Sequence, residues 1–192
     1  ALGIDHHLKR GKLKAAAVKL DLTQQWVQDL VERELRLGRV EAVHMGPPCG
    51  TASKARNIPI RKKLRRAGAP NPQPLRSSKF PEGFPWLKGI SKAKVASANI
   101  LYEFAAKIAN ICEQCGILFT IENPQNSLMW ETKFFAPLVE RFNFHVVDAC
   151  EYGSMHKKGT AFLANFVAPR LQKRCGGGHA HKDWKVQRMD NG

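Results

Sequence analysis

Residues 117–121 (ILFTI) are the feature that most limits how this chain can fold. Such a continuous apolar run is typical of a parallel strand that is covered on both faces. The preceding residues 95–115 have the length and apolar periodicity of a packed helix, which Gly116 ends. A helix that leads directly into a buried strand predicts an α/β fold with a parallel sheet.

Further strands and helices alternate along the chain. Apolar runs predict strands at residues 2–5, 15–22, 40–45, 144–149 and 161–167. Helical spacing predicts a helix over residues 24–37, with Thr23 as its N-cap and Gly38 as its stop. Residues 127–142 are expected to be helical with an interruption at Pro137. We therefore expect a doubly wound, mostly parallel sheet that binds ligands at the carboxyl ends of its strands.

Length and composition restrict the class of protein. With 192 residues, the chain has room for one domain, expected at residues 1–170, followed by a Cys-, His- and Gly-rich tail at 171–192. It contains no run of about 18 uncharged apolar residues, so we expect no membrane span. Five cysteines are an odd number, which argues against a disulfide framework and for a reducing nuclear or cytoplasmic location.

Positive charge is the strongest compositional signal. A formal net charge of +15 favours a polyanionic partner, most simply nucleic acid. Residues 51–79 contain nine basic residues and no acidic one, and four prolines there argue against a continuous helix. A long loop of this kind in a compact domain is usually functional or disordered. We expect a basic loop at residues 51–90 that contacts nucleic acid.

Cys49 and Glu122 are the candidate catalytic residues. Cys49 follows the expected strand 40–45 across a turn that two prolines make rigid, and Gly50 leaves the space after it open. Such a turn can hold a reactive thiol, whereas the commonest fate of a free cysteine is a buried structural role. Glu122 follows the apolar run 117–121, where a carboxylate without a partner is costly. It can point into the same crevice as Cys49 or stand at a helix N-terminus.

Two short motifs resemble those of the cytosine-C5 DNA methyltransferase family. Residues 46–49 (Gly-Pro-Pro-Cys) resemble the family's nucleophile motif, and residues 121–124 (Ile-Glu-Asn-Pro) resemble its Glu-Asn motif. Residues 151–158 resemble a later segment of the family. The string HMGPPCGTAS around the cysteine is also similar to methyltransferase-like domains of retroelement polyproteins. The resemblance covers about residues 5–166 and implies the Rossmann-like fold of S-adenosylmethionine-dependent methyltransferases.

The resemblance also implies a mechanism and a set of site residues. The Cys49 thiolate adds to C6 of a cytosine that has left the base stack, Glu122 holds or protonates N3, and C5 takes a methyl group from S-adenosylmethionine. The implied catalytic residues are Cys49, Glu122, Pro48, Asn123 and Lys158. The implied cofactor-binding residues are Asp5 (ribose), Asp21 (adenine), Leu22 and Pro47. The implied contacts to DNA are Ser53, Lys54, Arg56, Arg61, Lys62, Lys63, Arg65, Arg66 and Lys157.

The chain departs from the family pattern in two places. The glycine-rich cofactor motif should precede Asp5 and is missing, so we expect an N-terminally incomplete fold that is fused to or preceded by a segment carrying this motif. His156, Lys158 and Thr160 stand where the family has Gln and two Arg. These departures favour an alternative, a catalytically inactive nucleic-acid-binding domain of a mobile element. A further alternative is an RNA cytosine methyltransferase.

A zinc site is an alternative use of the tail. Thiol and imidazole ligands occur there at close spacing, in Cys175, His179 and His181. Cys112 and Cys115 form a C-x2-C pair that can contribute, although on an apolar helical stretch they are more simply core residues. A zinc deaminase is excluded, because its Pro-Cys-x-x-Cys signature is not formed at Cys49, which is followed by Gly-Thr-Ala.

Overall fold

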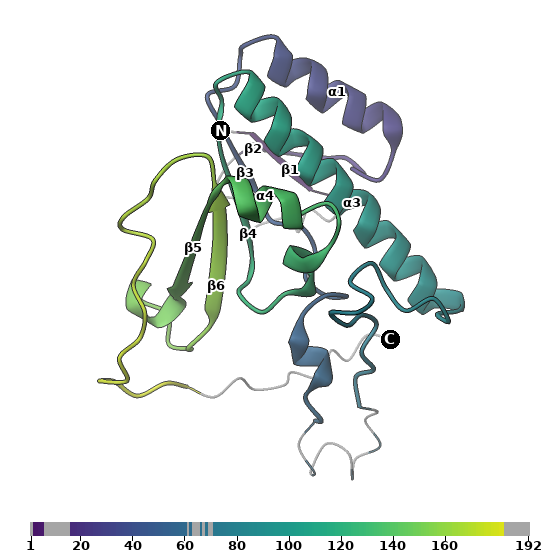
Figure 1. Cartoon of the computed structure of the whole chain (residues 1–192), viewed down its shortest axis with the longest axis vertical. Coiled ribbons are helices and arrows are strands. Elements are labelled where there is room, and N and C mark those ends of the chain that lie inside the picture. The colour runs from purple at the N-terminus through teal and green to yellow at the C-terminus, as the bar shows by residue number, and fades with distance from the viewer. Residues whose placement is uncertain are drawn as a thin grey trace.

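Strands and helices alternate along the chain and build two separate β-sheets with covering helices (Figure 1). The computed structural model describes residues 2–5, 16–60, 62, 66, 68 and 71–182. In chain order its elements are β1 (Leu2–Asp5), β2 (Ala16–Lys19), α1 (Gln25–Arg36), β3 (Ala42–Met45), η1 (Lys54–Asn57), α3 (Gly89–Gln114), β4 (Leu118–Pro124), η2 (Leu128–Glu131), α4 (Ala136–Arg141), β5 (Asn143–Asp148), η3 (Ala149–Tyr152) and β6 (Gly159–Ala164). The fold is therefore mixed α/β, as the sequence predicted.

The two sheets differ in size and strand direction. β1 and β2 form a parallel pair, and the other four strands form a sheet in the order β3-β4-β6-β5. β3 and β4 are parallel, whereas β6 runs antiparallel to both β4 and β5. A parallel crossover needs a dozen or more residues, and the connection between β5 and β6, residues 149–158, is shorter. The expected single, mostly parallel sheet is therefore not seen among the described strands.

The predicted helices are present with altered ends. α3 begins at Gly89, earlier than the periodicity indicated. The N-cap of α1 is Gln24, which makes no side-chain cap bond, because Thr23 donates its N–H and its hydroxyl to Asp21 instead. The segment 127–142 forms two short helices, and its proline lies in the first turn of α4, where it is tolerated. None of the described helices is long and apolar enough to cross a membrane.

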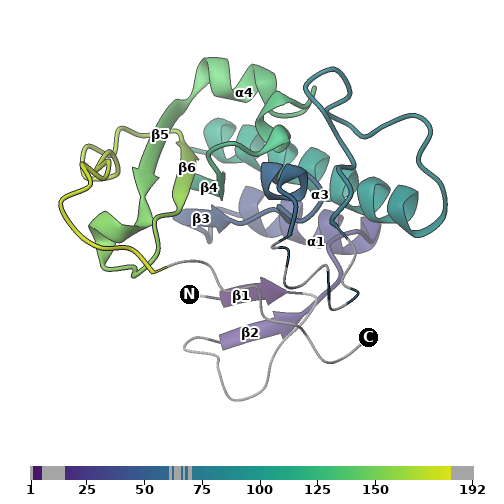
Figure 2. The same cartoon turned by 90° about the horizontal axis from the view of Figure 1, so that it is seen from below.

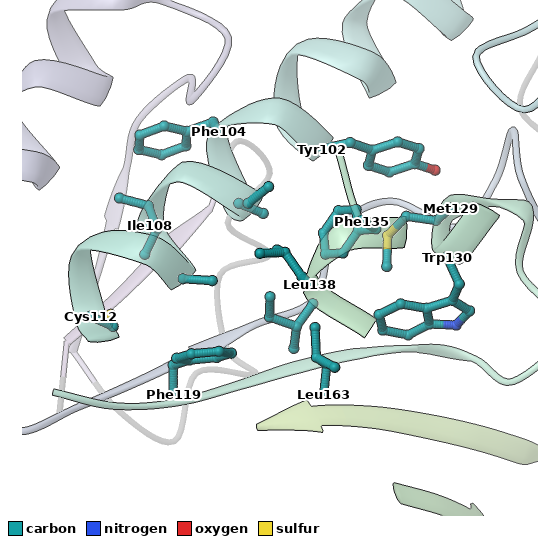
Figure 3. Packing of buried hydrophobic residues seen from close by; sticks show 14 of the residues in the cluster. Tyr102, Phe104, Ile108, Cys112, Phe119, Met129, Trp130, Phe135, Leu138 and Leu163 are labelled. Atoms are coloured by element: carbon teal, nitrogen blue, oxygen red, sulfur yellow. The ribbon is translucent and has the colours of Figure 1, made fainter. Parts of the chain in front are cut away.

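The hydrophobic core lies on one face of the four-stranded sheet (Figure 3). Phe119 and Ile121 of β4 and Leu163 of β6 are at most 1% exposed and pack with side chains from α1, α3, η2 and α4. Leu118 is 50% exposed. Neighbouring residues of a strand point to opposite faces, so β4 is covered on one face only. The prediction that residues 117–121 are covered on both faces was wrong, because these helices all pack against the same core.

Truncations of Phe119 and Leu118 test this one-sided cover. Phe119→Ala removes a buried ring and should lower the free energy of unfolding by about 3–5 kcal/mol. Leu118→Ala removes a half-exposed side chain from the same strand and should cost less than about 1 kcal/mol. Urea denaturation followed by circular dichroism measures both values. Equal losses in the two variants would mean that both faces of β4 are covered.

Candidate functional site

The parallel pairing of β3 and β4 brings the two sequence motifs together at the carboxyl ends of these strands. The ladder between the two strands ends where Met45 is paired with Ile121, and each motif continues from there. Asn123 donates a hydrogen bond from Nδ2 to the Pro47 carbonyl at 2.8 Å, although the two residues are 76 positions apart. The Gly-Pro-Pro-Cys turn is thus tied directly to the Glu-Asn strand.

The turn at Cys49 has a fixed backbone and an accessible thiol. The Tyr102 hydroxyl of α3 donates to the Pro48 carbonyl at 2.7 Å. The Cys49 carbonyl accepts from the N–H groups of Ala52 and Ser53, at 3.0 and 2.8 Å. Cys49 itself is exposed, so it is not a buried structural cysteine. A nucleophile requires this combination of a rigid backbone and an open approach.

Glu122 lies inside β4, and not in a turn after the strand as the sequence indicated, because β4 continues to Pro124. This position also excludes a role at a helix N-terminus. The Glu122 side chain is 28% exposed, and Lys158 donates from Nζ to Oε1 at 3.2 Å. Lys158 directly precedes β6, the strand paired with β4. An ion pair this accessible adds little stability, so its main effect is to orient the carboxylate.

Arg76 is a buried cation that supports the turn after β3. It is 2% exposed, and its guanidinium donates to Thr51 Oγ1 at 3.0 and 3.2 Å, to Asn99 Oδ1 at 2.7 Å and to the Pro81 carbonyl at 2.7 Å. The guanidinium carbon also lies 5.1 Å from the centre of the Tyr102 ring. Burial lowers the pKa of Arg76 and raises the pKa of Tyr102.

Sequence reasoning counted Arg76 among the cations of the basic loop and missed both it and Tyr102 as supports of the site. An arginine in a loop without acids suggests a surface cation. These hydrogen-bond acceptors are neutral oxygens from separate segments, which leave no signature in the sequence.

Arg56 and Ser53, which the sequence assigned to nucleic-acid contacts, make hydrogen bonds within the loop. Arg56 donates to the carbonyls of Gly50 and Gln73, at 2.5 and 3.0 Å, and so closes the loop on itself. Ser53 accepts a hydrogen bond from the N–H of Ala55 at 3.2 Å and caps η1. Both side chains are partly exposed and make hydrogen bonds within the loop, and their contacts with DNA stay predictions.

The remaining basic residues of this set are largely accessible. Lys54 pairs with Glu131 at 3.7 Å, and both side chains are more than a third exposed. Lys62, Arg66 and Lys157 are exposed. Three further residues of the set lie outside the described residues: Arg61, Lys63 and Arg65.

The predicted cofactor-binding residues follow three different strands. Asp5 ends β1 and is exposed. Asp21 follows β2, and its Oδ1 accepts the two hydrogen bonds from Thr23, at 3.0 and 2.7 Å. A carboxylate at the end of such a strand can accept hydrogen bonds from ribose hydroxyl groups, and one after the next strand can accept from an adenine amino group, so the donor types of S-adenosylmethionine fit this pair. Leu22 packs against the core, and the Pro47 carbonyl already accepts a hydrogen bond from Asn123. These two residues can therefore contribute van der Waals contacts to a cofactor.

Four side chains of metal-ligand type lie together in the described part of the chain: Cys150, Cys175, His179 and His181. One ligand atom from each lies within 4.8 Å of all the others. Cys112 and Cys115 are not part of this cluster. Cys112 is a core residue, as expected, and burial raises the pKa of its thiol to about 11 (Figure 3). Cys115 is exposed, so the expectation that it belongs to the core was wrong.

The tail hydrogen-bonds to the body of the fold. The carbonyl of Lys173 accepts from the N–H of Asp148, and the Asp148 carboxylate accepts from Arg174 Nε at 3.1 Å and from the N–H of Cys175 at 2.9 Å. These donors, the N–H of Cys175 first, hold the pKa of Asp148 below its ordinary value. Residues 171–182 are thus attached to the end of β5.

No protein-family model, no curated protein and no solved structure matches this chain.

Replacing Arg76 tests whether the network beneath the turn is structural. Arg76→Met keeps an unbranched side chain but leaves Asn99 Oδ1 and the Pro81 carbonyl without this donor, so the free energy of unfolding should fall by about 2–4 kcal/mol. Arg66→Met removes an exposed cation of the same loop and should change it by less than about 0.5 kcal/mol. Urea denaturation compares the two variants. A loss for Arg76→Met no larger than that for Arg66→Met would contradict the structural role.

Proposed function

We propose that this chain is a domain of an S-adenosylmethionine-dependent cytosine-C5 DNA methyltransferase. The observation that carries the proposal is the hydrogen bond from Asn123 to Pro47 across the paired strands β3 and β4. It joins a Gly-Pro-Pro-Cys turn with an exposed thiol to the Glu-Asn strand. Each motif alone is short and weakly diagnostic, and their direct contact supports one shared site.

In the proposed reaction, Cys49 is the nucleophile and Glu122 the acid. The thiolate forms a bond to C6 of a flipped cytosine while the Glu122 carboxyl gives its proton to N3, which moves electron density to C5. S-adenosylmethionine, when bound, would supply the methyl group that C5 accepts and would leave as S-adenosylhomocysteine. A base then removes the C5 proton, the electrons of that bond restore the C5–C6 double bond, and the thiolate leaves. N3 returns its proton to Glu122.

Lys158 is the positioning residue for Glu122 in this proposal. Its ammonium lies 3.2 Å from the carboxylate, and its own carbonyl accepts from the N–H of Ala149 at 2.9 Å, which holds the backbone in place. A lysine acts as a point charge without the guanidinium fork of the arginine that the family carries here. It can therefore orient one carboxylate oxygen, but it cannot hold both in a bidentate pair.

The division into two sheets supports an N-terminally incomplete fold. In a doubly wound sheet with strand order 3-2-1-4-5-6, the first strand lies between the second and the fourth. If β1 and β2 correspond to the second and third strands, and β3 and β4 to the fourth and fifth, the first strand belongs between β1 and β3. Among the described strands β1 pairs only with β2 and β3 only with β4, and Figure 2 shows β1 on the β3 side of the larger sheet.

The exposure of the small sheet supports the same arrangement. Leu2 of β1 is 66% exposed and Val18 of β2 is 41% exposed. Parallel strands are normally buried, and two strands alone are marginally stable. A segment that supplies a strand between β1 and β3 would join the two sheets. In the proposed function this segment carries the glycine-rich cofactor motif.

A second candidate function is a catalytically inactive domain that binds nucleic acid through its basic loop. The observation that favours it is Thr160, which stands where the family has its second arginine. Thr160 is 5% exposed in β6, where it pairs with Pro124. A buried threonine cannot replace a cation that contacts a base or a phosphate.

Trapping of the cysteine on DNA separates the two functions. The wild-type chain, incubated with S-adenosylmethionine and a duplex that contains 5-fluorocytosine, should form a covalent adduct, because fluorine blocks the final elimination. Cys49→Ala should form none, and Cys115→Ser, which changes an exposed cysteine elsewhere, should keep the adduct. Denaturing electrophoresis measures the adduct.

A duplex that contains 5-azacytosine tests Cys49 apart from the cofactor, since this ring accepts a thiolate without methyl transfer. No adduct on either duplex would overturn the catalytic proposal and favour the binding domain. Adducts on RNA but not on DNA would favour the RNA methyltransferase.

The salt dependence of DNA binding tests the basic loop. If Lys62 and Arg66 contact phosphates, their double replacement by alanine should reduce the slope of log K against log[salt] by about 2. Replacing Arg33 in α1 and Arg39 just after it, both exposed cations, makes the same charge change elsewhere and should leave the slope nearly unaltered. Fluorescence anisotropy at a series of salt concentrations gives the slopes. Equal reductions in both double variants would assign binding to net charge and not to the loop.

A further inference from the structure

The cluster of two thiols and two imidazoles has the dimensions of a metal site. Cys175 Sγ lies 3.4 Å from His181 Nε2 and 3.9 Å from His179 Nε2. In a tetrahedral site with Zn–S of about 2.3 Å and Zn–N of about 2.0–2.1 Å, sulfur and nitrogen are about 3.5 Å apart. We propose that Cys150, Cys175, His179 and His181 together bind one structural zinc ion that fastens the tail to the end of β5.

The ligands come from two parts of the chain that hydrogen bonds hold together. Cys150 lies in η3, directly after β5, and the other three lie in the tail. The Asp148 carboxylate accepts from the N–H of Cys175 at 2.9 Å. On the far side of the ligands, Lys182 donates its N–H to the Met155 carbonyl at 2.8 Å. Hydrogen bonds on both sides of residues 175–181 therefore place the ligands beside Cys150 in advance.

The backbone around Cys175 suits a thiolate. The N–H of Gly177 points at Cys175 Sγ at 3.4 Å, and hydrogen bonds of this kind stabilise a metal-bound sulfur. Gly177 has a φ of +86°, which glycine adopts without strain, so the turn that aims this N–H needs a glycine.

The ligand set identifies the metal and the type of site. Two thiolates and two imidazoles in tetrahedral arrangement select zinc, whereas magnesium and calcium prefer oxygen ligands. With four protein ligands no position is open for water or substrate, so the site is structural and not catalytic. This inference is independent of the proposed methyltransferase function.

A disulfide between Cys150 and Cys175 is the competing use of the two sulfurs. All five cysteines are free thiols in the structure, and a disulfide would leave both imidazoles without a role. His179 and His181, whose ring centres are 4.6 Å apart, both direct Nε2 toward Cys175 Sγ, which a shared metal ion accounts for and a disulfide does not.

Metal analysis of the full chain tests the proposal. Protein purified without chelator should contain about one zinc per chain, by inductively coupled plasma mass spectrometry. Cys150→Ser and His181→Ala should each lower this content at least several-fold, and Cys115→Ser, an exposed cysteine outside the cluster, should leave it unchanged. Cobalt substitution should give the intense visible bands and the thiolate charge-transfer band of a tetrahedral site in the wild type, but not in Cys150→Ser.

Chelation gives a second readout that does not depend on the variants folding well. EDTA should lower the Tm of the wild type by several degrees, because a ligand that binds only the folded state stabilises it. Zinc at background level together with an unchanged Tm would overturn the proposal, as would a thiol titration that finds Cys150 and Cys175 joined in a disulfide. Full zinc content in Cys150→Ser would also overturn it, because the tail alone would then hold the metal.

Discussion

Parallel pairing of β3 with β4 is the constraint on which the rest of the candidate site depends. Two parallel neighbours cannot be joined by a tight turn, so the chain must leave the end of β3, cross the protein and return to start β4 on the far side. Here the crossover contains the Cys49 turn, the basic loop and α3. One topological requirement therefore places the thiol, the cationic loop and the supporting helix in a single connection, and the Asn123 hydrogen bond to Pro47 closes it against β4.

The support beneath the turn explains how an exposed thiol can coexist with a fixed backbone. Tyr102 reaches the Pro48 carbonyl from the core side, and Arg76 lies on the Tyr102 ring and binds Thr51. Arginine suits this place because its planar guanidinium directs several N–H donors at once, whereas a lysine ammonium would satisfy fewer acceptors in fixed directions. A buried cation is costly in itself. Its value here is that it joins three segments, the turn, the end of the loop and α3, and leaves the thiol outside.

The strands of the larger sheet differ in how they are covered from solvent. Helices cover the core face of all its strands, the tail is attached at the end of β5, and Leu118 at the start of β4 is half exposed. The antiparallel β6 follows from the short connection at residues 149–158 and also places Lys158 beside Glu122. In the proposed function the edge at β3 is the side on which the strand between β1 and β3 would lie. At the opposite edge the tail is fastened to η3.

The sequence by itself determined the α/β class, the positions of most elements and the two motifs, because these depend on local periodicity, on turn residues and on the identities of neighbouring residues. It also indicated that Cys112 belongs to the core, since an apolar helical stretch surrounds it. Only the tertiary structure decided that β6 is antiparallel and that Glu122 lies within a strand. It also decided that Arg76 is buried, that Arg56 hydrogen-bonds within its own loop, and that Cys150 and not Cys112 or Cys115 meets the tail. Each of these features depends on contacts between residues that are distant in the chain. A neutral carbonyl or a thiol that becomes a partner only after folding has no recognisable pattern in the sequence. The contact between the two motifs depends on both the sequence and the tertiary structure. The sequence contains the residues of the two motifs, and the pairing of β3 with β4 brings them together.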